Sequence, residues 1–131
     1  MLQGTIRSSF LLAALFWAGL IFYLSSQPSI EAPALFPGQD KLFHLIAFGI
    51  LGFLTMGTLQ ASHAGYPTRR VWLVVLAVTL YGILDEVHQY FVPGRNADIY
   101  DALADALDGL LGAWAMYYLV RVVVRRSPTK S

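Results

Sequence analysis

The sequence predicts an all-α fold, a polytopic membrane protein whose single domain (residues 1–131) is a bundle of four transmembrane helices. The chain of 131 residues is 56% hydrophobic and has a mean hydropathy of +0.57. Only 13% of its residues are charged, about half of the roughly 25% that is usual in soluble domains. The apolar residues also gather into four runs, each close to the ~20 residues that a spanning helix needs.

The first two helices follow from apolar runs that no formal charge interrupts. Residues 8–30 and 42–68 contain no Lys, Arg, Asp or Glu. Each run is long enough to cross the hydrocarbon core of a bilayer, which is about 30 Å thick. We therefore predict helices at about 8–26 and 41–60.

The last two helices follow from apolar runs that contain acidic residues. The run over 71–92 passes Asp85 and Glu86, and the run over 99–120 passes three aspartates. We predict helices at about 71–91 and 99–120, followed by a basic tail over 121–131.

The Lys and Arg residues predict the orientation in the membrane. With four spans, the N-terminus, the middle loop and the C-terminus lie on the same side. This side holds Arg7, Arg69, Arg70, Arg121, Arg125, Arg126 and Lys130. Because loops rich in Lys and Arg stay inside, we predict a multi-pass protein with both termini and the basic tail in the cytoplasm.

All acidic residues fall in the outer half of the molecule under this topology. They are Glu31, Asp40, Asp85, Glu86, Asp98, Asp101, Asp105 and Asp108. Ionisable side chains at membrane depth are costly and usually face the bundle interior or a water-filled cavity. At 1.5 Å of rise per residue, His44, Glu86 and Asp105 lie at similar depths on three helices. The sequence thus predicts a polar site near the outer surface, shared by the second, third and fourth helices.

Helical spacing sorts the polar residues into stripes, because residues three or four apart share a face. The stripe on the fourth helix contains Asp98, Asp101, Asp105 and Asp108. The stripe on the third helix contains Asp85, His88 and Gln89, and the second helix adds Asp40 and His44. Glu86 lies about 100° round from Asp85, so both carboxylates are expected to point inward only if the helix is distorted.

Two pairs of glycines lie on the predicted helices, each pair three residues apart. Gly49 and Gly52 belong to the second helix, and Gly109 and Gly112 belong to the fourth. Small residues allow membrane helices to approach closely. We expect these glycines to serve packing rather than catalysis.

Four blocks of residues lie near the helix ends between residues 25 and 112. They are Ser25-Ser26-Gln27-Pro28, Asp40-Lys41-x-x-His44-x-x-x-Phe48, Asp85-Glu86-x-x-Gln89-x-Phe91-x-Pro93-Gly94-Arg95, and Asp101-x-x-x-Asp105 followed by glycines. In order and spacing, these blocks resemble the VanZ-like family of small bacterial membrane proteins. The resemblance implies a polytopic protein of the cell (inner, cytoplasmic) membrane. The founding member of that family is an accessory to resistance against the glycopeptide antibiotic teicoplanin.

The resemblance also implies a set of motif residues. These are Asp40, Lys41, His44, Glu86, Gln89, Arg95, Asp101 and Asp105. Two acids depart from the family pattern, since a small residue is expected where Asp108 stands and an asparagine is common where Asp105 stands. Both departures make the expected site more negative.

The donor atoms of this set suit a hard divalent cation such as Mg²⁺ or Ca²⁺, and a histidine leaves room for Zn²⁺ or Mn²⁺. The candidate metal ligands are Asp85, Asp101, Asp105 and Asp108. The candidate catalytic residues are Glu86, His44 and Asp101. The candidate ligand-binding residues are Lys41, Gln89, Arg95, Asp40, Asp85, His88 and Asp105. A buried ion-pair network is the structural alternative, but the eight acids exceed the nearby basic groups, and the excess calls for solvent, protonation or a bound cation.

Two functions stay open at this point. In the first, the protein is a non-catalytic envelope factor that binds a lipid-linked or peptidoglycan-related ligand, or the glycopeptide target, and changes glycopeptide sensitivity. In the second, it is a small metal-assisted hydrolase or transferase that acts on a lipid head group in the membrane. A proton or cation pathway ranks last, because the cytoplasmic half has no matching acids. The expected partners are membrane lipid and an envelope precursor, with no nucleic acid.

Overall fold

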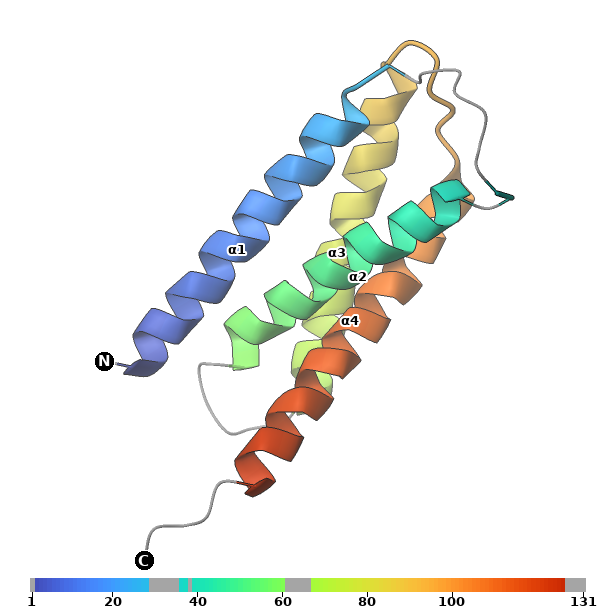
Figure 1. Cartoon of the computed structure of the whole chain (residues 1–131). Helices are drawn as coiled ribbons and strands as arrows, with labels where there is room; N and C mark the ends of the chain where they lie inside the picture. Colours follow the sequence, from blue (N-terminus) through green and yellow to red (C-terminus); the bar gives the residue numbers. More distant parts are fainter. Residues whose placement is uncertain (1, 29–35, 38, 61–66, 127–131) are drawn as a thin grey trace, which may run out of the picture.

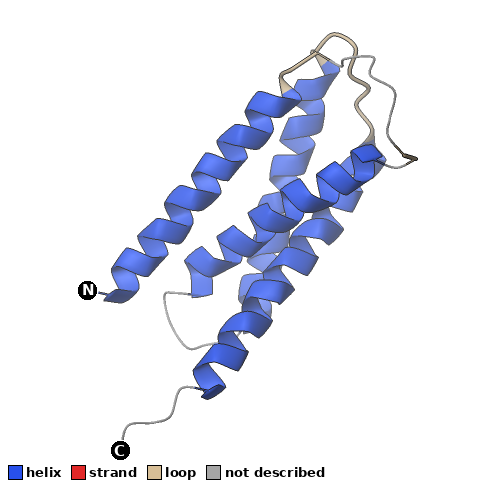
Figure 2. Cartoon of the chain, in the orientation of Figure 1, coloured by secondary structure: helices blue, strands red, loops and turns tan. Residues whose placement is uncertain are grey.

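The computed structural model describes residues 2–28, 36–37, 39–60 and 67–126. Its four helices are α1 (Leu2–Ser25), α2 (Gln39–Gln60), α3 (Pro67–Tyr90) and α4 (Ile99–Arg126). All four are long and apolar enough to cross a membrane, and the described residues contain no strand (Figure 2). The predicted class, an all-α membrane protein with four transmembrane helices, is confirmed. Glu31 and residues 127–131 of the predicted tail lie outside the described part of the chain.

The first and last helices are longer than the predicted spans. Helix α1 begins at Leu2 rather than at residue 8, and α4 continues to Arg126 rather than ending at residue 120. The predicted limits followed the charges of Arg7 and Arg121. A charged residue ends the apolar stretch, but it does not interrupt the backbone hydrogen bonds of a helix, so both helices continue past the hydrocarbon core.

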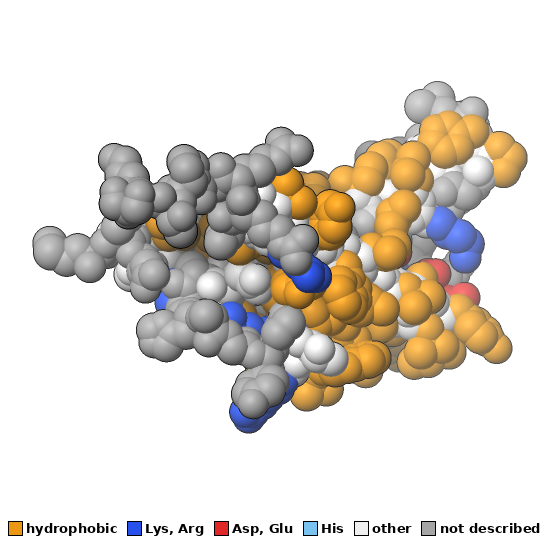
Figure 3. Space-filling model, turned by 90° about the horizontal axis from the view of Figure 1, so that it is seen from below, with side chains coloured by type: hydrophobic (Ala, Val, Ile, Leu, Met, Phe, Trp, Pro, Cys, Tyr) orange, Lys and Arg blue, Asp and Glu red, His pale blue; other side chains and the backbone are white. Residues whose placement is uncertain are grey.

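The helix ends alternate between two ends of the bundle. Figure 1 shows the N- and C-termini at one end, while α1 and α3 finish and α2 and α4 begin at the other end. The basic residues Arg7, Arg69, Arg70 and Arg121 belong to the helix segments near the termini. Figure 3 looks at this end and shows Lys and Arg side chains beside a hydrophobic flank. This arrangement is what a four-pass topology requires.

Helices α2 and α4 pack against each other through their glycines. A Cβ atom at Gly52 would lie 2.8 Å from the Cα of Gly109, and one at Gly112 would overlap the carbonyl of Gly49. Atoms cannot share this space, so both positions exclude a side chain. The packing role expected for these glycines is confirmed.

The apolar core lies between the helices, below the polar end. Phe48, Met56, Val74 and Val78 are almost completely buried, and Ala113 completes the contact on α4. Large apolar side chains such as Phe16 and Leu107 face outward instead. In water this surface would be costly, but in a bilayer it is the expected lipid-facing side.

Helix α1 is fastened to the bundle by side chains that reach backbone carbonyls. The indole Nε1–H of Trp17 donates to the carbonyl of Ala47 on α2 at 2.8 Å. The hydroxyl of Tyr81 on α3 donates to the carbonyl of Ala18. Both contacts leave the end of α1 beside the end of α3, where the polar residues gather.

Candidate metal centre

Three helices bring one acid or histidine each to a common point. His44 lies near the start of α2, Glu86 near the end of α3 and Asp101 in the first turn of α4. One potential ligand atom of each lies within 4.8 Å of the other two. Since ligand atoms lie about 2.0–2.6 Å from a bound cation, this spacing fits a single divalent ion. These three are the residues that the sequence named as catalytic candidates.

His44 is oriented by a second carboxylate. Its Nδ1 lies 3.0 Å from Oδ1 of Asp105, which is 0% exposed. In the tautomer that carries its proton on Nδ1, the ring donates to this carboxylate and the lone pair of Nε2 is left for a cation. A histidine that binds a metal commonly donates its other N–H to a carboxylate in this way, which fixes the ring and increases its basicity. The ring also stacks on Phe48, with 5.9 Å between centroids.

The side chain of Asp105 on α4 packs between α2 and α3. On the side away from His44, its Oδ2 is buried and has no hydrogen-bond partner among the described residues. A Cβ atom at Gly82 of α3 would lie 2.9 Å from this oxygen. Any residue larger than glycine would therefore displace the carboxylate. Asp108, one turn further along α4, is buried as well. Burial of an unpaired carboxylate costs free energy. A cation bound by the neighbouring ligands would offset this cost.

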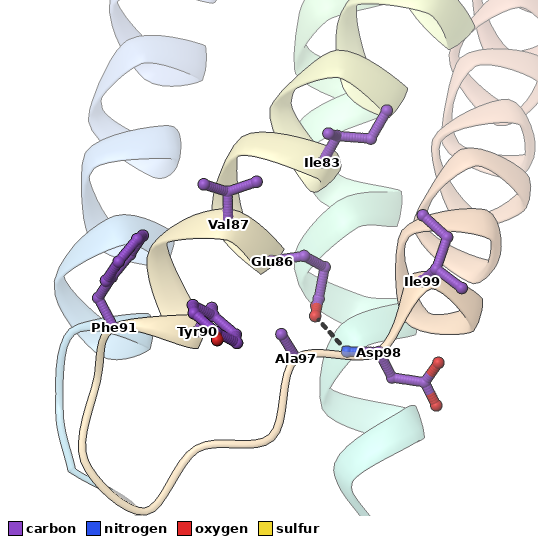
Figure 4. Close-up of a pocket in the computed structure, with 8 residues that line it drawn as sticks. All are labelled: Ile83, Glu86, Val87, Tyr90, Phe91, Ala97, Asp98 and Ile99. Carbon is purple, nitrogen blue, oxygen red and sulfur yellow. Dashed lines mark hydrogen bonds between the residues drawn. The ribbon is translucent and has the colours of Figure 1, made fainter.

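Glu86 is 6% exposed and joins α3 to the start of α4. Its Oε2 accepts the backbone N–H of Asp98 at 2.8 Å (Figure 4). Asp98 in turn caps α4, because its Oδ1 accepts the N–H of Tyr100 at 2.9 Å. The carboxylate of Glu86 therefore sits near a helix N-terminus, which favours negative charge. Among the described residues no hydrogen bond engages its Oε1, which is available as a ligand.

The third-helix stripe predicted by the sequence faces α1 and forms a separate cluster. Oδ2 of Asp85 accepts hydrogen bonds from Ser25 Oγ and Gln89 Nε2, both at 2.9 Å. His88 Nε2 lies 2.9 Å from Ser26 Oγ. Asp85 and His88 thus connect α3 to the end of α1, and Gln89 supports Asp85 from the same helix. The three residues are not part of the group formed by His44, Glu86 and Asp101.

Arg95 also belongs to this second cluster. Its guanidinium donates to the carbonyls of Leu24 and Gln27, each at 3.1 Å. Leu24 belongs to the last turn of α1, where its carbonyl also accepts the N–H of Gln27 at 3.2 Å, and Gln27 lies two residues past the helix end. Of the remaining candidates, Lys41 is exposed, and the side chain of Asp40 lies outside the described part of the chain.

Three residues of these clusters were not among the candidate site residues of the sequence interpretation. Ser25 and Ser26 stood in a recognised block, but hydroxyl groups carry no charge or periodic signal that marks them. Gly82 was not singled out, although it lies four residues before Glu86 and therefore shares its helix face. That spacing was the only indication in the sequence that a neighbouring helix could approach α3 closely beside the site.

Comparison with protein families gives a match that covers most of the chain. A family model described as VanZ/LLP1 matches residues 10–121. The match includes all three residues of the candidate metal centre and the cluster around Asp85. Searches of curated proteins and of solved structures give no significant match.

Proposed function

Because this chain belongs to the VanZ/LLP1 family of multi-pass membrane proteins, we propose that it is a cell-envelope factor that binds a phosphorylated, lipid-linked ligand through a divalent cation. The observation that carries this proposal is the convergence of His44, Glu86 and Asp101 from three helices. Asp105 lies behind the histidine and orients its ring. Together the four residues form an ordered set of potential metal ligands, which an unorganised excess of acidic residues would not provide.

Three protein ligands leave coordination positions open. Mg²⁺ and Mn²⁺ are usually six-coordinate, and Mg²⁺ in particular completes its shell with waters and substrate phosphates. A phosphate or pyrophosphate oxygen could occupy such a position. Without a cation, the surrounding carboxylates would repel an anionic head group, so binding is expected to depend on the ion.

The charge distribution supports placing this site at the outer face of the cytoplasmic membrane, with both termini in the cytoplasm. Lipid-linked envelope precursors exposed there are ligands of the proposed kind. Binding such a precursor, or the region that a glycopeptide targets, would change sensitivity to teicoplanin.

A metal-assisted hydrolase or transferase is the second candidate function. Three protein ligands plus an open position are the usual arrangement of catalytic zinc sites. A cation held by His44, Glu86 and Asp101 would lower the pKa of a water for hydrolysis of a phosphate ester, which would release the head group and an alcohol. Release of a labelled head group by the purified protein would favour this function over simple binding.

The cation site can be tested with Mn²⁺ by electron paramagnetic resonance on the full-length protein in lipid nanodiscs. His44→Ala, Glu86→Gln and Asp101→Asn should each weaken Mn²⁺ binding by at least about tenfold, since the first removes a ligand and the other two replace a charged carboxylate by a neutral, weaker amide oxygen. Asp85→Asn is the matched control, because it makes the same carboxylate-to-amide change in the cluster that faces α1. Wild-type Mn²⁺ affinity in all three ligand variants would refute the site.

The cellular role can be tested by comparing teicoplanin sensitivity. Cells that produce the wild-type protein should differ from cells that produce the Glu86→Gln variant at equal membrane levels. Equal sensitivity, with the Mn²⁺ site confirmed, would separate the cation site from any glycopeptide effect.

A further inference from the structure

A groove with a volume of about 300 Å³ opens between the end of α3 and the start of α4 (Figure 4). Its apolar lining consists of Ile83, Val87, Tyr90, Phe91, Ala97 and Ile99. Tyr90 and Phe91 are among the most exposed side chains of the molecule. They lie at the end of a membrane-spanning helix, where aromatic residues commonly sit at the interface between lipid and water. The exposed aromatic side chains therefore place the groove at the membrane interface, at the end that the charge distribution assigns to the outer leaflet.

The polar end of this groove is shared with the candidate metal centre. Glu86 lines the groove and is also one of the three convergent ligands. Figure 4 shows its side chain reaching from α3 toward the backbone nitrogen of Asp98, between the apolar residues of the two helices. A molecule in the groove thus lies one side chain away from the cation position.

We propose that this groove holds a hydrocarbon chain of the ligand, so that the ligand is a phosphorylated lipid that enters sideways from the outer leaflet. The inference rests on the proposed cation-dependent binding of a head group and adds where the chain of that ligand lies. A soluble phosphate would use the cation alone and leave the apolar walls uncovered. A lipid uses both parts at once, with its charged head at the cation and its chain along Val87 and Ile99.

A second copy of the protein fits this groove less well. In a symmetric dimer the same patch of both copies meets. Glu86 and Asp98 of one copy would then approach the same two acids of the other, and like charges at close range are unfavourable. A neutral hydrocarbon chain brings no such repulsion.

The test uses the full-length protein in phosphatidylcholine nanodiscs that contain Mn²⁺ and phosphatidic acid with a photoreactive group in its acyl chain. Cross-links should map to residues 83–99. Unlabelled phosphatidic acid should compete them away, whereas glycerol phosphate, which has the same head group without the chains, should not.

The Val87→Trp substitution fills the groove. The variant should therefore lack the labelling that unlabelled phosphatidic acid competes away in the wild-type protein. Leu76→Trp is the matched control, because Leu76 lies on the same helix, outside the groove, and is 56% exposed against 54% for Val87. Ala97→Leu narrows the groove from the side of α4 and should act like Val87→Trp. Mn²⁺ affinity measured on the same preparations reports the cation site separately.

Normal competable labelling in both groove variants, or competition by glycerol phosphate as strong as by phosphatidic acid, would overturn the inference. Cross-links between two copies at residues 83–99 would overturn it in favour of a dimer. Groove labelling that persists in a protein without Mn²⁺ affinity would support the chain-binding groove and refute the cation-dependent function on which it was built.

Discussion

Asp105 shows how one residue joins packing to chemistry. One carboxylate oxygen accepts the Nδ1–H of His44, and the other lies against Gly82 without a hydrogen-bond partner in the described residues. An asparagine, which the family resemblance makes a common residue at this position, could also accept from the histidine, but it lacks the formal charge. A carboxylate behind the histidine increases the basicity of the ring, which would strengthen the binding of a cation at the proposed centre.

Replacing Gly82 by alanine should weaken Mn²⁺ binding although Gly82 is no ligand. The new Cβ would lie 2.9 Å from Oδ2 and 3.2 Å from Cβ of Asp105, so the carboxylate must move and His44 loses its orientation. Changes behind a metal ligand typically cost about 10–100-fold in affinity. Gly19→Ala is the control, since no atom lies within 4 Å of a Cβ there. Equal Mn²⁺ affinity in both variants would show that Asp105 does not position the histidine.

Two adjacent acidic residues of helix α3 face two different neighbouring helices. Successive residues on a helix point about 100° apart, so Asp85 faces Ser25 of α1 while Glu86 faces the start of α4. The sequence predicted a distorted helix if both were to point inward. The helix is nevertheless regular over Pro67–Tyr90. No distortion is needed, because α1 covers Asp85 and the start of α4 covers Glu86.

The Arg95→Ala variant should loosen the end of α1. The guanidinium bonds to the carbonyls of Leu24 and Gln27 would be lost, and the last turn of α1 would fray. Amide hydrogen exchange around residues 24–27 should become faster, while Arg121→Ala, at the opposite end of the bundle, should leave it unchanged. Unaltered exchange in the Arg95 variant would mean that these contacts do not hold α1.

Helix number, order and polar faces could be predicted from the sequence because run length and period are local properties. A polar site shared by three helices followed from the similar depths of His44, Glu86 and Asp105, and Asp101 lies on the same stripe of α4 as Asp105. The separation of Asp85, His88 and Gln89 from them could not be predicted, because a stripe defines a face and not the helix that covers it. The partners that decide the matter are Ser25 and Ser26, whose hydroxyl groups leave no pattern along the chain.

At the scale of the whole molecule, the two ends of the bundle differ in charge. The end with the termini carries most of the basic residues, and the other end carries the acids of the candidate metal centre. Between them lies a belt of exposed leucine, isoleucine and phenylalanine side chains. By the positive-inside rule this asymmetry predicts which end meets the cytoplasm, and therefore which leaflet would supply the proposed ligand.

Labelling of single cysteines should confirm this orientation, since the chain contains no cysteine of its own. Asn96→Cys, in the exposed connection between α3 and α4, should react with an impermeant maleimide added to intact spheroplasts. Thr68→Cys, exposed near the start of α3, should react only after the membrane is permeabilised. The reverse pattern would place the candidate metal centre on the cytoplasmic side and exclude an outer-leaflet ligand.

The stripe of acids on α4 also has a consequence for how the protein is made. An aspartate near the middle of a spanning helix costs about 2.5–3.5 kcal/mol on insertion scales, and α4 carries Asp105 and Asp108 toward the bilayer interior. This helix is synthesised last, when α2 and α3 can already offer His44 and the space beside Gly82. Its entry into the bilayer is therefore expected to depend on docking against α2 and α3, which are synthesised before it.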